Sequence, residues 1–167
     1  MGPPPPSERA LVDALDPYER LIEVGVGRRP SVARSLADRG REVVAFDVAV
    51  SEAARDAATE TRTPSGGTLR VVAADVTALA TVDDGREVRR ALGIGASDEV
   101  GGETPNAAGG VDAVYARNLP AELQSATVAL AERLDAACLF TTLGFEEPVV
   151  GVSRRAAASG TVVYVAR

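Results

Sequence analysis

The stretch "LIEVGVGRRP" at positions 21–30 decides the fold, because an apolar run ends there in two glycines two residues apart. The run "RLIEVG" (20–25) is rich in aliphatic residues and too short for a helix. The segment "RPSVARSLADRG" (29–40) then places its apolar residues on one helical face and ends at Gly40, a typical helix stop. The pattern predicts a strand, a glycine turn and a helix.

The same order of elements recurs along the chain. The run "REVVAFD" (41–47) reads as a second strand, which completes a βαβ unit with a right-handed crossover. Near-continuous Val, Ala and Leu in the later runs indicate strands that are buried on both faces. The sequence therefore predicts an α/β fold with an open, mainly parallel Rossmann-like sheet and helices on both faces, a three-layer αβα sandwich. Further strands are expected at 69–75, 111–117, 136–142 and 160–167, and helices at 7–15, capped by Ser7, and at 120–134.

One domain accounts for the chain, since 167 residues lie within the usual size of a single domain. We expect a disordered proline-rich tail at 1–6 and a single Rossmann-like domain at 7–167. The segment 79–110 is rich in glycines and acids and lacks sustained periodicity, which predicts a flexible insertion. The polar stretch 51–67 is expected to begin as a helix and to lose it before the third strand.

Composition limits the class of partner. The net charge is -6, and all 18 basic residues are arginine, which disfavours an extended nucleic-acid surface. An acidic chain without lysine suits a protein of concentrated salt, a halophile, although GC-rich codons would equally explain the absence of lysine. We expect no membrane span and a cytoplasmic location, because no apolar stretch approaches the ~20 residues that a span needs. The sequence identifies no protein partner.

The chain offers few groups for proton transfer or metal binding. It has no histidine, so the sequence identifies no catalytic residue, and chemistry would depend on positioning. The single Cys138 lies in an apolar run and reads as a core residue. No metal site is expected, since the acidic residues of the 79–110 segment form no ligand spacing; they are Asp83, Asp84, Asp98, Glu99 and Glu103.

Carboxylates around the glycine turn favour a ligand that contains adenosine. Asp47 falls 22 residues after Gly25 at the end of the second strand, where a carboxylate binds the two hydroxyls of a ribose. Glu23 is suited to a cationic group such as an ammonium, although an ion pair with a neighbouring arginine would also explain it. An NAD site is opposed by Pro30, which stands where the dinucleotide fingerprint has its third glycine.

These residues resemble class I S-adenosylmethionine-dependent methyltransferases over roughly positions 20–142. The features are Glu23-x-Gly25-x-Gly27 after the first strand, Asp47 after the second, and Asp75 with Val76 after the third. The resemblance implies a bound S-adenosylmethionine, its ammonium, ribose and adenine held by those three groups in turn. Asp47 and Asp75 could instead cap the turn or helix that follows. The chain departs from the family at the third glycine of the loop and in showing one clear C-terminal strand where a β-hairpin is usual.

A closer resemblance joins three segments of the chain. The stretches "IEVGVGRRPSVARSLADRG" (22–40), "VVAADVT" (71–77) and "CLFTTLGFEEPVVG" (138–151) are similar to a small archaeal family of uncharacterised Rossmann-like proteins. That family has no established activity, so this resemblance implies a fold and leaves the function open.

The end of the fourth predicted strand supplies the weaker candidates for substrate contact. Tyr115, Arg117 and Asn118 lie where ligands enter open α/β sheets, although Tyr115 also suits the core. The segment "NLP" (118–120) lacks the second proline and the aromatic residue of the amino-methylase motif. Three functions therefore stay open: a methyltransferase of unidentified acceptor, a non-catalytic nucleotide-binding or regulatory module, and an NAD-binding oxidoreductase, which the absence of lysine disfavours.

Overall fold

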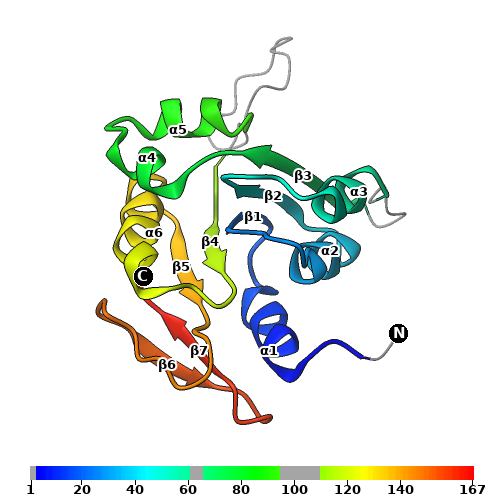
Figure 1. The fold of residues 1–167 in the computed structure, drawn as a ribbon, viewed down its shortest axis with the longest axis vertical. Helices are drawn as coiled ribbons and strands as arrows, with labels where there is room; N and C mark the ends of the chain where they lie inside the picture. The colour runs from blue at the N-terminus through cyan, green and yellow to red at the C-terminus, as the bar shows by residue number, and fades with distance from the viewer. Residues whose placement is uncertain (1–2, 61–65, 95–109) are drawn as a thin grey trace.

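A single seven-stranded sheet organises the computed structural model, which describes residues 3–60, 66–94 and 110–167 (Figure 1). The strand order is β3-β2-β1-β4-β5-β7-β6, and β3, β2, β1, β4 and β5 run parallel. Strand β7 runs antiparallel to both of its neighbours, β5 and β6. The strands are β1 (Arg20–Val24), β2 (Glu42–Asp47), β3 (Thr68–Ala73), β4 (Ala113–Ala116), β5 (Ala137–Phe140), β6 (Ser153–Ala156) and β7 (Val162–Val165).

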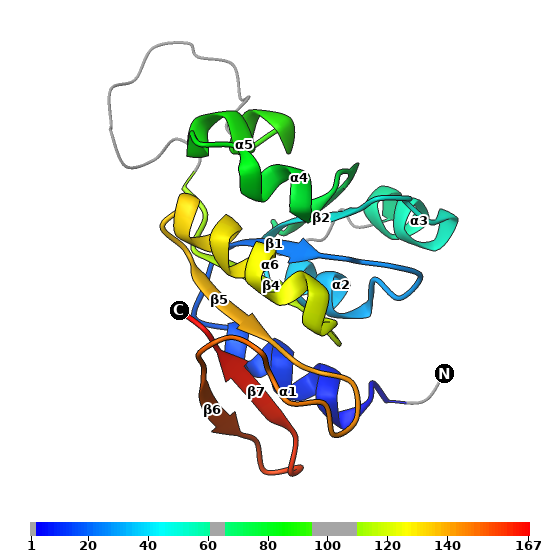
Figure 2. The same cartoon turned by 60° about the vertical axis from the view of Figure 1, so that its left-hand side comes forward.

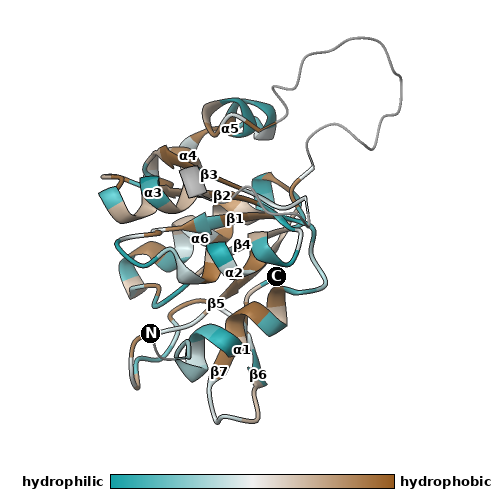
Figure 3. Cartoon of the chain, turned by 90° about the vertical axis from the view of Figure 1, so that its right-hand side faces the viewer, coloured by the Kyte–Doolittle hydropathy of each residue, from teal (hydrophilic) through white to brown (hydrophobic). Residues whose placement is uncertain are grey.

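Helices cover both faces of the sheet, as predicted. Helices α1 (Pro6–Leu15), α2 (Ser31–Asp38) and α3 (Glu52–Glu60) lie on one face. Helices α4 (Val76–Thr81), α5 (Gly85–Ala91) and α6 (Ala121–Arg133) lie on the other. In Figure 3 the strands are coloured mainly as hydrophobic, whereas the helices carry both hydrophilic and hydrophobic residues. Because successive strand residues point to opposite faces, the near-continuous apolar runs fill a core on each side.

The order of the strands reverses between β1 and β4, which are adjacent and parallel. Chain that leaves β1 turns toward α2 on one side, while chain that leaves β4 turns toward α6 on the other side. Such a reversal separates the loops at the carboxyl ends of the two strands and opens a crevice for ligands. The predicted ligand edge thus corresponds to the switch point of this sheet.

The start of the chain and the predicted insertion differ from expectation. Helix α1 begins at Pro6 rather than after a Ser7 cap, because proline is well tolerated in a first helical turn. Helices α4 and α5 occupy much of 79–94, and Val88 and Leu92 are fully buried, so this part of the predicted insertion is helical and packs on the core. The remainder of the predicted insertion, at 95–109, lies outside the described residues.

The C-terminal hairpin was also missed. Strands β6 and β7 form an antiparallel pair at the edge of the sheet beyond β5 (Figure 2). The residues of β6, "SRRA", are all exposed, so they carry none of the apolar signal by which a strand is recognised. The departure from the methyltransferase pattern that we expected here was therefore wrong.

Candidate functional site

The turn between β1 and α2 has a backbone geometry that favours glycine. Gly25 and Gly27 have φ values of 70° and 57°, in the left-handed region. Among the described residues, no heavy atom lies within 4 Å of the position that a Cβ would occupy at either glycine. The turn therefore exposes bare backbone beside the carboxyl end of β1, which leaves room for close approach by a ligand.

Hydrogen bonds hold this turn against the end of β2. The N–H groups of Gly25 and Val26 donate to the carbonyl of Phe46 at 2.9 and 3.2 Å. The N–H of Gly27 donates to Oδ2 of Asp47 at 2.8 Å, and the hydroxyl of Ser51 donates to the Gly27 carbonyl at 2.8 Å. Asp47 thus lies beside the turn, as the ribose prediction requires, and also fixes the conformation of that turn.

The N-terminus of α2 adds a positive dipole end to the same edge. Its N-cap residue is Pro30, which has no side-chain oxygen to accept from the first N–H groups of the helix. Free N–H groups at a helix start attract anionic groups. Arg28 and Arg29 are exposed in the turn. Among the described residues, neither arginine forms an ion pair with Glu23. The alternative that a neighbouring arginine explains this glutamate therefore does not apply.

Glu23 is a carboxyl group in the core. It is 1% exposed, and it lies opposite Tyr115 of β4 in the parallel register. Burial raises the pKa of Glu23 to about 8, although Arg117 and the Tyr115 hydroxyl lower it and Glu8 and Asp47 raise it further. Oε2 of Glu23 and the hydroxyl of Tyr115 both lack a partner with hydrogen-bond geometry among the described residues, despite their proximity.

A second buried carboxylate, Glu8, reaches this region from α1. It is 4% exposed, accepts from the Ser31 hydroxyl at 2.9 Å, and pairs with Arg117 at 3.5 Å. Glu8 therefore ties α1 to the start of α2 and the end of β4. Glu8 was not among the predicted site residues, although the sequence has a signal for it. It precedes Leu11, Val12 and Leu15 at helical spacing, so it is a charge on an apolar face.

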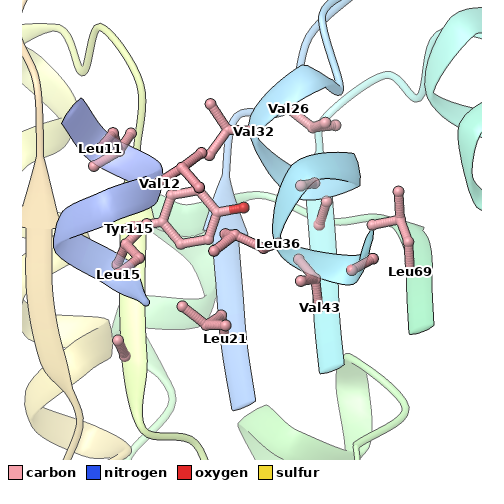
Figure 4. Close-up of a cluster of buried hydrophobic side chains, with 14 of the residues drawn as sticks. Leu11, Val12, Leu15, Leu21, Val26, Val32, Leu36, Val43, Leu69 and Tyr115 are labelled. Atoms are coloured by element: carbon pink, nitrogen blue, oxygen red, sulfur yellow. The ribbon is translucent and has the colours of Figure 1, made fainter. Parts of the chain in front are cut away.

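The three candidates after β4 lie in different environments. Tyr115 is fully buried, with its ring between residues of α1 and α2 (Figure 4), so it is a core residue, which was the alternative to substrate contact. Arg117 is 18% exposed in its side chain and belongs to the pair with Glu8. Asn118 is exposed and has a φ of 51°, and its N–H donates to the Thr141 hydroxyl at 3.0 Å. This bond joins the loops that follow β4 and β5.

Asp75 lies apart from these groups. Its carboxylate is exposed and accepts from the N–H of Thr77 at 2.8 Å, as the N-cap of α4. Asp75 therefore caps a helix, which was the alternative to ligand binding, and its contact with adenine stays a prediction. Glu23, Gly25, Gly27 and Asp47, by contrast, come together at the carboxyl ends of β1 and β2.

The remaining chemistry-bearing groups do not form a site. Cys138 is buried, and burial raises the pKa of its thiol to about 12, so the group is a neutral core residue. Within residues 3–60, 66–94 and 110–167, no cluster of three or more His, Cys, Asp or Glu residues could hold a metal ion. In the same part of the chain, no helix combines the length and the apolar character needed to cross a membrane.

Comparison with known proteins places the chain among its relatives. The model of the uncharacterised protein family UPF0146 matches residues 10–77 and 66–167. The chain belongs to this family. Proteins of UPF0146 from two strains of Halobacterium salinarum, a halophilic archaeon, are each 37% identical to it over 163 residues. These matches cover 98% of this chain and 96% of each relative. The predicted uncharacterised family is thereby confirmed, and these two relatives of the chain come from a halophilic archaeon.

Solved structures support the fold of this UPF0146 member. A magnesium protoporphyrin IX methyltransferase from Synechocystis with bound S-adenosylhomocysteine has a TM-score of 0.54 at 15% identity, over 96% of this chain and 82% of that chain. A precorrin 8w decarboxylase from Methanobacterium thermoautotrophicum scores 0.52 at 18% identity, over 99% and 92%. A TehB-like S-adenosylmethionine-dependent methyltransferase from Corynebacterium glutamicum scores 0.51 at 14% identity, over 95% and 85%. The UPF0146 chain shares their Rossmann-like methyltransferase fold.

Proposed function

We propose that this UPF0146 protein binds S-adenosylmethionine at the carboxyl ends of β1, β2 and β4. One observation carries the proposal: the open glycine turn is held by a hydrogen bond from Gly27 to the carboxylate of Asp47. Bare backbone at Gly25 and Gly27 leaves space for the amino-acid end of the cofactor. Asp47 would accept the hydroxyls of its ribose. Asp75, exposed at the end of β3, is proposed to lie nearer the adenine.

The strand order favours this cofactor over NAD. In the dinucleotide fold the order is 3-2-1-4-5-6, whereas here antiparallel β7 lies between β5 and β6. Pro30 also replaces the third glycine of the dinucleotide fingerprint at the start of α2. Solved neighbours with this fold bind S-adenosylmethionine or S-adenosylhomocysteine. Their identity to this chain is low, so they support the proposal through the fold alone.

Methyl transfer is the reaction that such a site could perform with the residues present. The sulfonium of the cofactor supplies an activated methyl group, and a well-placed acceptor with a lone pair needs no covalent intermediate. The chain would then contribute orientation, which suits a protein without histidine. We propose a small-molecule cofactor and a cytoplasmic methyltransferase, whose acceptor is not identified.

A non-catalytic binding module is the second candidate. Tyr115 packs in the core, and Arg117 is engaged by Glu8, so these two residues do not offer their polar groups freely to an acceptor. Of the predicted acceptor residues, Asn118 alone is exposed. A module that binds the cofactor without transferring its methyl group is consistent with this arrangement.

Calorimetry in concentrated salt tests the cofactor. We expect S-adenosylmethionine to bind and NAD to bind far more weakly. Asp47→Ala should weaken the binding roughly 10- to 100-fold, because bonds from a charged group contribute about 1.5–3 kcal/mol each. Asp83→Ala is the matched control, since Asp83 is an exposed aspartate between α4 and α5. Equal affinity in both variants, or no binding by the wild type, would overturn the assignment.

Transfer itself needs a separate measurement. Methyl-labelled S-adenosylmethionine, incubated with the protein and an extract of a halophilic archaeon, should label an acceptor when the protein is a methyltransferase. Binding without any labelling above the Asp47→Ala background would favour the non-catalytic module.

A further inference from the structure

The buried cluster of Glu8, Glu23, Tyr115 and Arg117 carries an uneven charge. It lies where α1, β1 and β4 meet, and its two carboxyl groups are 4% and 1% exposed. Arg117 is the one cation that acts on both of them among the described residues, by an ion pair to Glu8 and by its charge on Glu23. With both acids ionised, the cluster would hold one more negative than positive charge.

Glu23 is the member of the cluster whose charge is not compensated. Glu8 has a hydroxyl donor in Ser31 and an ion pair with Arg117, whereas Oε2 of Glu23 has no partner among the described residues. An ionised carboxylate without a partner is costly to bury, and a protonated one is much less so. The burial of Glu23 raises its pKa to about 8, in agreement with a proton held there at neutral pH.

We propose that Glu23 exchanges this proton for the ammonium group at the amino-acid end of the ligand. The inference rests on the proposed binding of S-adenosylmethionine and defines how that binding is regulated. In the exchange no covalent bond changes except the O–H bond of Glu23. Its carboxyl becomes a carboxylate, the proton passes to solvent, and the ligand keeps its ammonium. The cluster is then neutral both without the ligand, when Glu23 is protonated, and with it, when the ammonium balances the ionised Glu23.

The other groups that face Glu23 are unsuited to be the source of the proton that is released when the ligand binds. Tyr115 of β4 has a pKa raised well above its ordinary value by burial and by Glu23 itself, so it stays neutral. Arg117 acts on Glu23 as a positive charge, and α2 contributes the uncharged hydroxyl of Ser31 through Glu8. Asp47 of β2 and Glu8 of α1 act on Glu23 as negative charges, which favour the protonated form in the absence of a cation.

The exchange distinguishes ligands by their amino-acid end. S-adenosylhomocysteine has the ammonium but no sulfonium charge, and adenosine has neither. Both ligands share the ribose and the adenine. We expect S-adenosylhomocysteine to release close to one proton when it binds at about pH 6.5, because a group with a pKa near 8 is almost fully protonated there. Adenosine should release none.

Calorimetry in two buffers of different ionisation enthalpy, phosphate and imidazole, measures this release. The wild type, Glu23→Gln and Glu87→Gln are compared; Glu87 is an exposed glutamate of α5. The wild type and Glu87→Gln should release the proton, and Glu23→Gln should not. In the wild type, the affinity for S-adenosylhomocysteine should rise up to roughly tenfold per pH unit below about pH 8 and level off above it.

The outcomes separate this inference from the proposed function. Binding of S-adenosylhomocysteine with no proton release, with the same release in Glu23→Gln, or with an affinity independent of pH overturns the exchange and leaves the cofactor assignment intact. Failure of S-adenosylhomocysteine and adenosine to bind the wild type overturns both. The pH dependence needs no variant, so the test does not depend on the folding of Glu23→Gln.

Discussion

Glu23 is held in an environment that opposes its charge. In the folded chain its pKa is about 8, against an ordinary value of 4.5, with burial as the largest cause. Between these two values the folded state binds a proton that the unfolded state does not bind. Stability therefore falls as pH rises through this window, by up to about 1.4 kcal/mol per unit for a single group.

Glu23→Gln should remove this loss of stability at rising pH. The glutamine has nearly the shape of the protonated acid and does not titrate, so its advantage over the wild type should grow by roughly 2–4 kcal/mol between about pH 5 and pH 8. Denaturant unfolding at the two pH values measures the free energies. Glu87→Gln controls for the loss of a carboxyl, and parallel pH profiles for Glu23→Gln and the wild type would contradict the prediction.

Gly27 has a left-handed conformation without any crowding. Its φ is 57°, and among the described residues nothing lies within 4 Å of the point that a Cβ would occupy, so the backbone alone resists a side chain. Gly27→Ala should cost about 1–2 kcal/mol of unfolding free energy. Gly151→Ala is the control, because Gly151 has open space and no positive φ. Thermal unfolding of both variants tests this, and equal melting temperatures would show that φ is not the cause.

Sequence alone predicted the structural features that are local in the chain. The positive φ of Gly25 and Gly27 and the place of Asp47 follow from a strand, a turn and a second strand within 27 residues, at 21–47. The apolar face around Glu8 is a local signal, but its partner could not be predicted, because Arg117 is 109 positions away and only the folded chain joins α1 to the end of β4. Tyr115 was ambiguous for the same reason, since packing by α1 and α2 decides its burial.

At the scale of elements, α2 and β3 approach each other at their backbones. A Cβ on Gly67, just before β3, would lie 1.7 Å from the carbonyl oxygen of Ala37 in α2. No backbone atom can yield at that distance, so the helix and the strand would have to separate. The lack of a side chain at Gly67 thus determines how closely this helix packs on the sheet.

Gly67→Ala should therefore destabilise the domain by about 2–3 kcal/mol or more, through forced displacement of packed backbone. Gly110→Ala is the matched control, because Gly110 has open space among the described residues and no positive φ. Chemical denaturation measures both variants. A Gly67→Ala variant as stable as Gly110→Ala would contradict this account of the α2–β3 contact.

Short elements were the hardest to predict. Helices α4 and α5 have six and seven residues, too few for an apolar face to repeat, and the cap residues Asp75 and Asp84 were the clearest signal. Strand β6 has no buried residue, so only its pairing with β7 identifies it. Strand β2 was predicted from its continuous run of four buried residues, and helix α6 from its length of 13 residues.

At the scale of the whole molecule, the parallel half of the sheet follows from the helices that connect successive strands, because a helical crossover lets two strands run parallel in one sheet. The direction of β7 does not, since an isolated apolar run has no signal for parallel or antiparallel pairing. That direction is what separates this fold from the dinucleotide fold. The comparison between the two cofactors thus depends on a property that only the assembled sheet reveals.

The excess of acidic residues makes the whole chain sensitive to salt. A net charge of -6 without any lysine produces mutual repulsion in the compact state, which salt screens. Surface ion pairs offset part of this repulsion. Exposed pairs, such as Arg39 with Asp13 and Asp16, contribute only about 0–1 kcal/mol each to the free energy of unfolding. The melting temperature should therefore rise by several degrees between about 0.1 M and about 2 M potassium chloride.

A charge-reduced variant distinguishes repulsion from general effects of salt on apolar burial. The double substitution Asp83→Asn with Glu87→Gln removes two exposed negative charges and brings the net charge from -6 to -4. Its melting temperature should exceed that of the wild type at about 0.1 M salt and approach it at about 2 M, where the Debye length is only a few ångströms. An equal rise in both proteins would assign the salt effect to stronger burial of apolar surface, because that contribution is independent of these two charges.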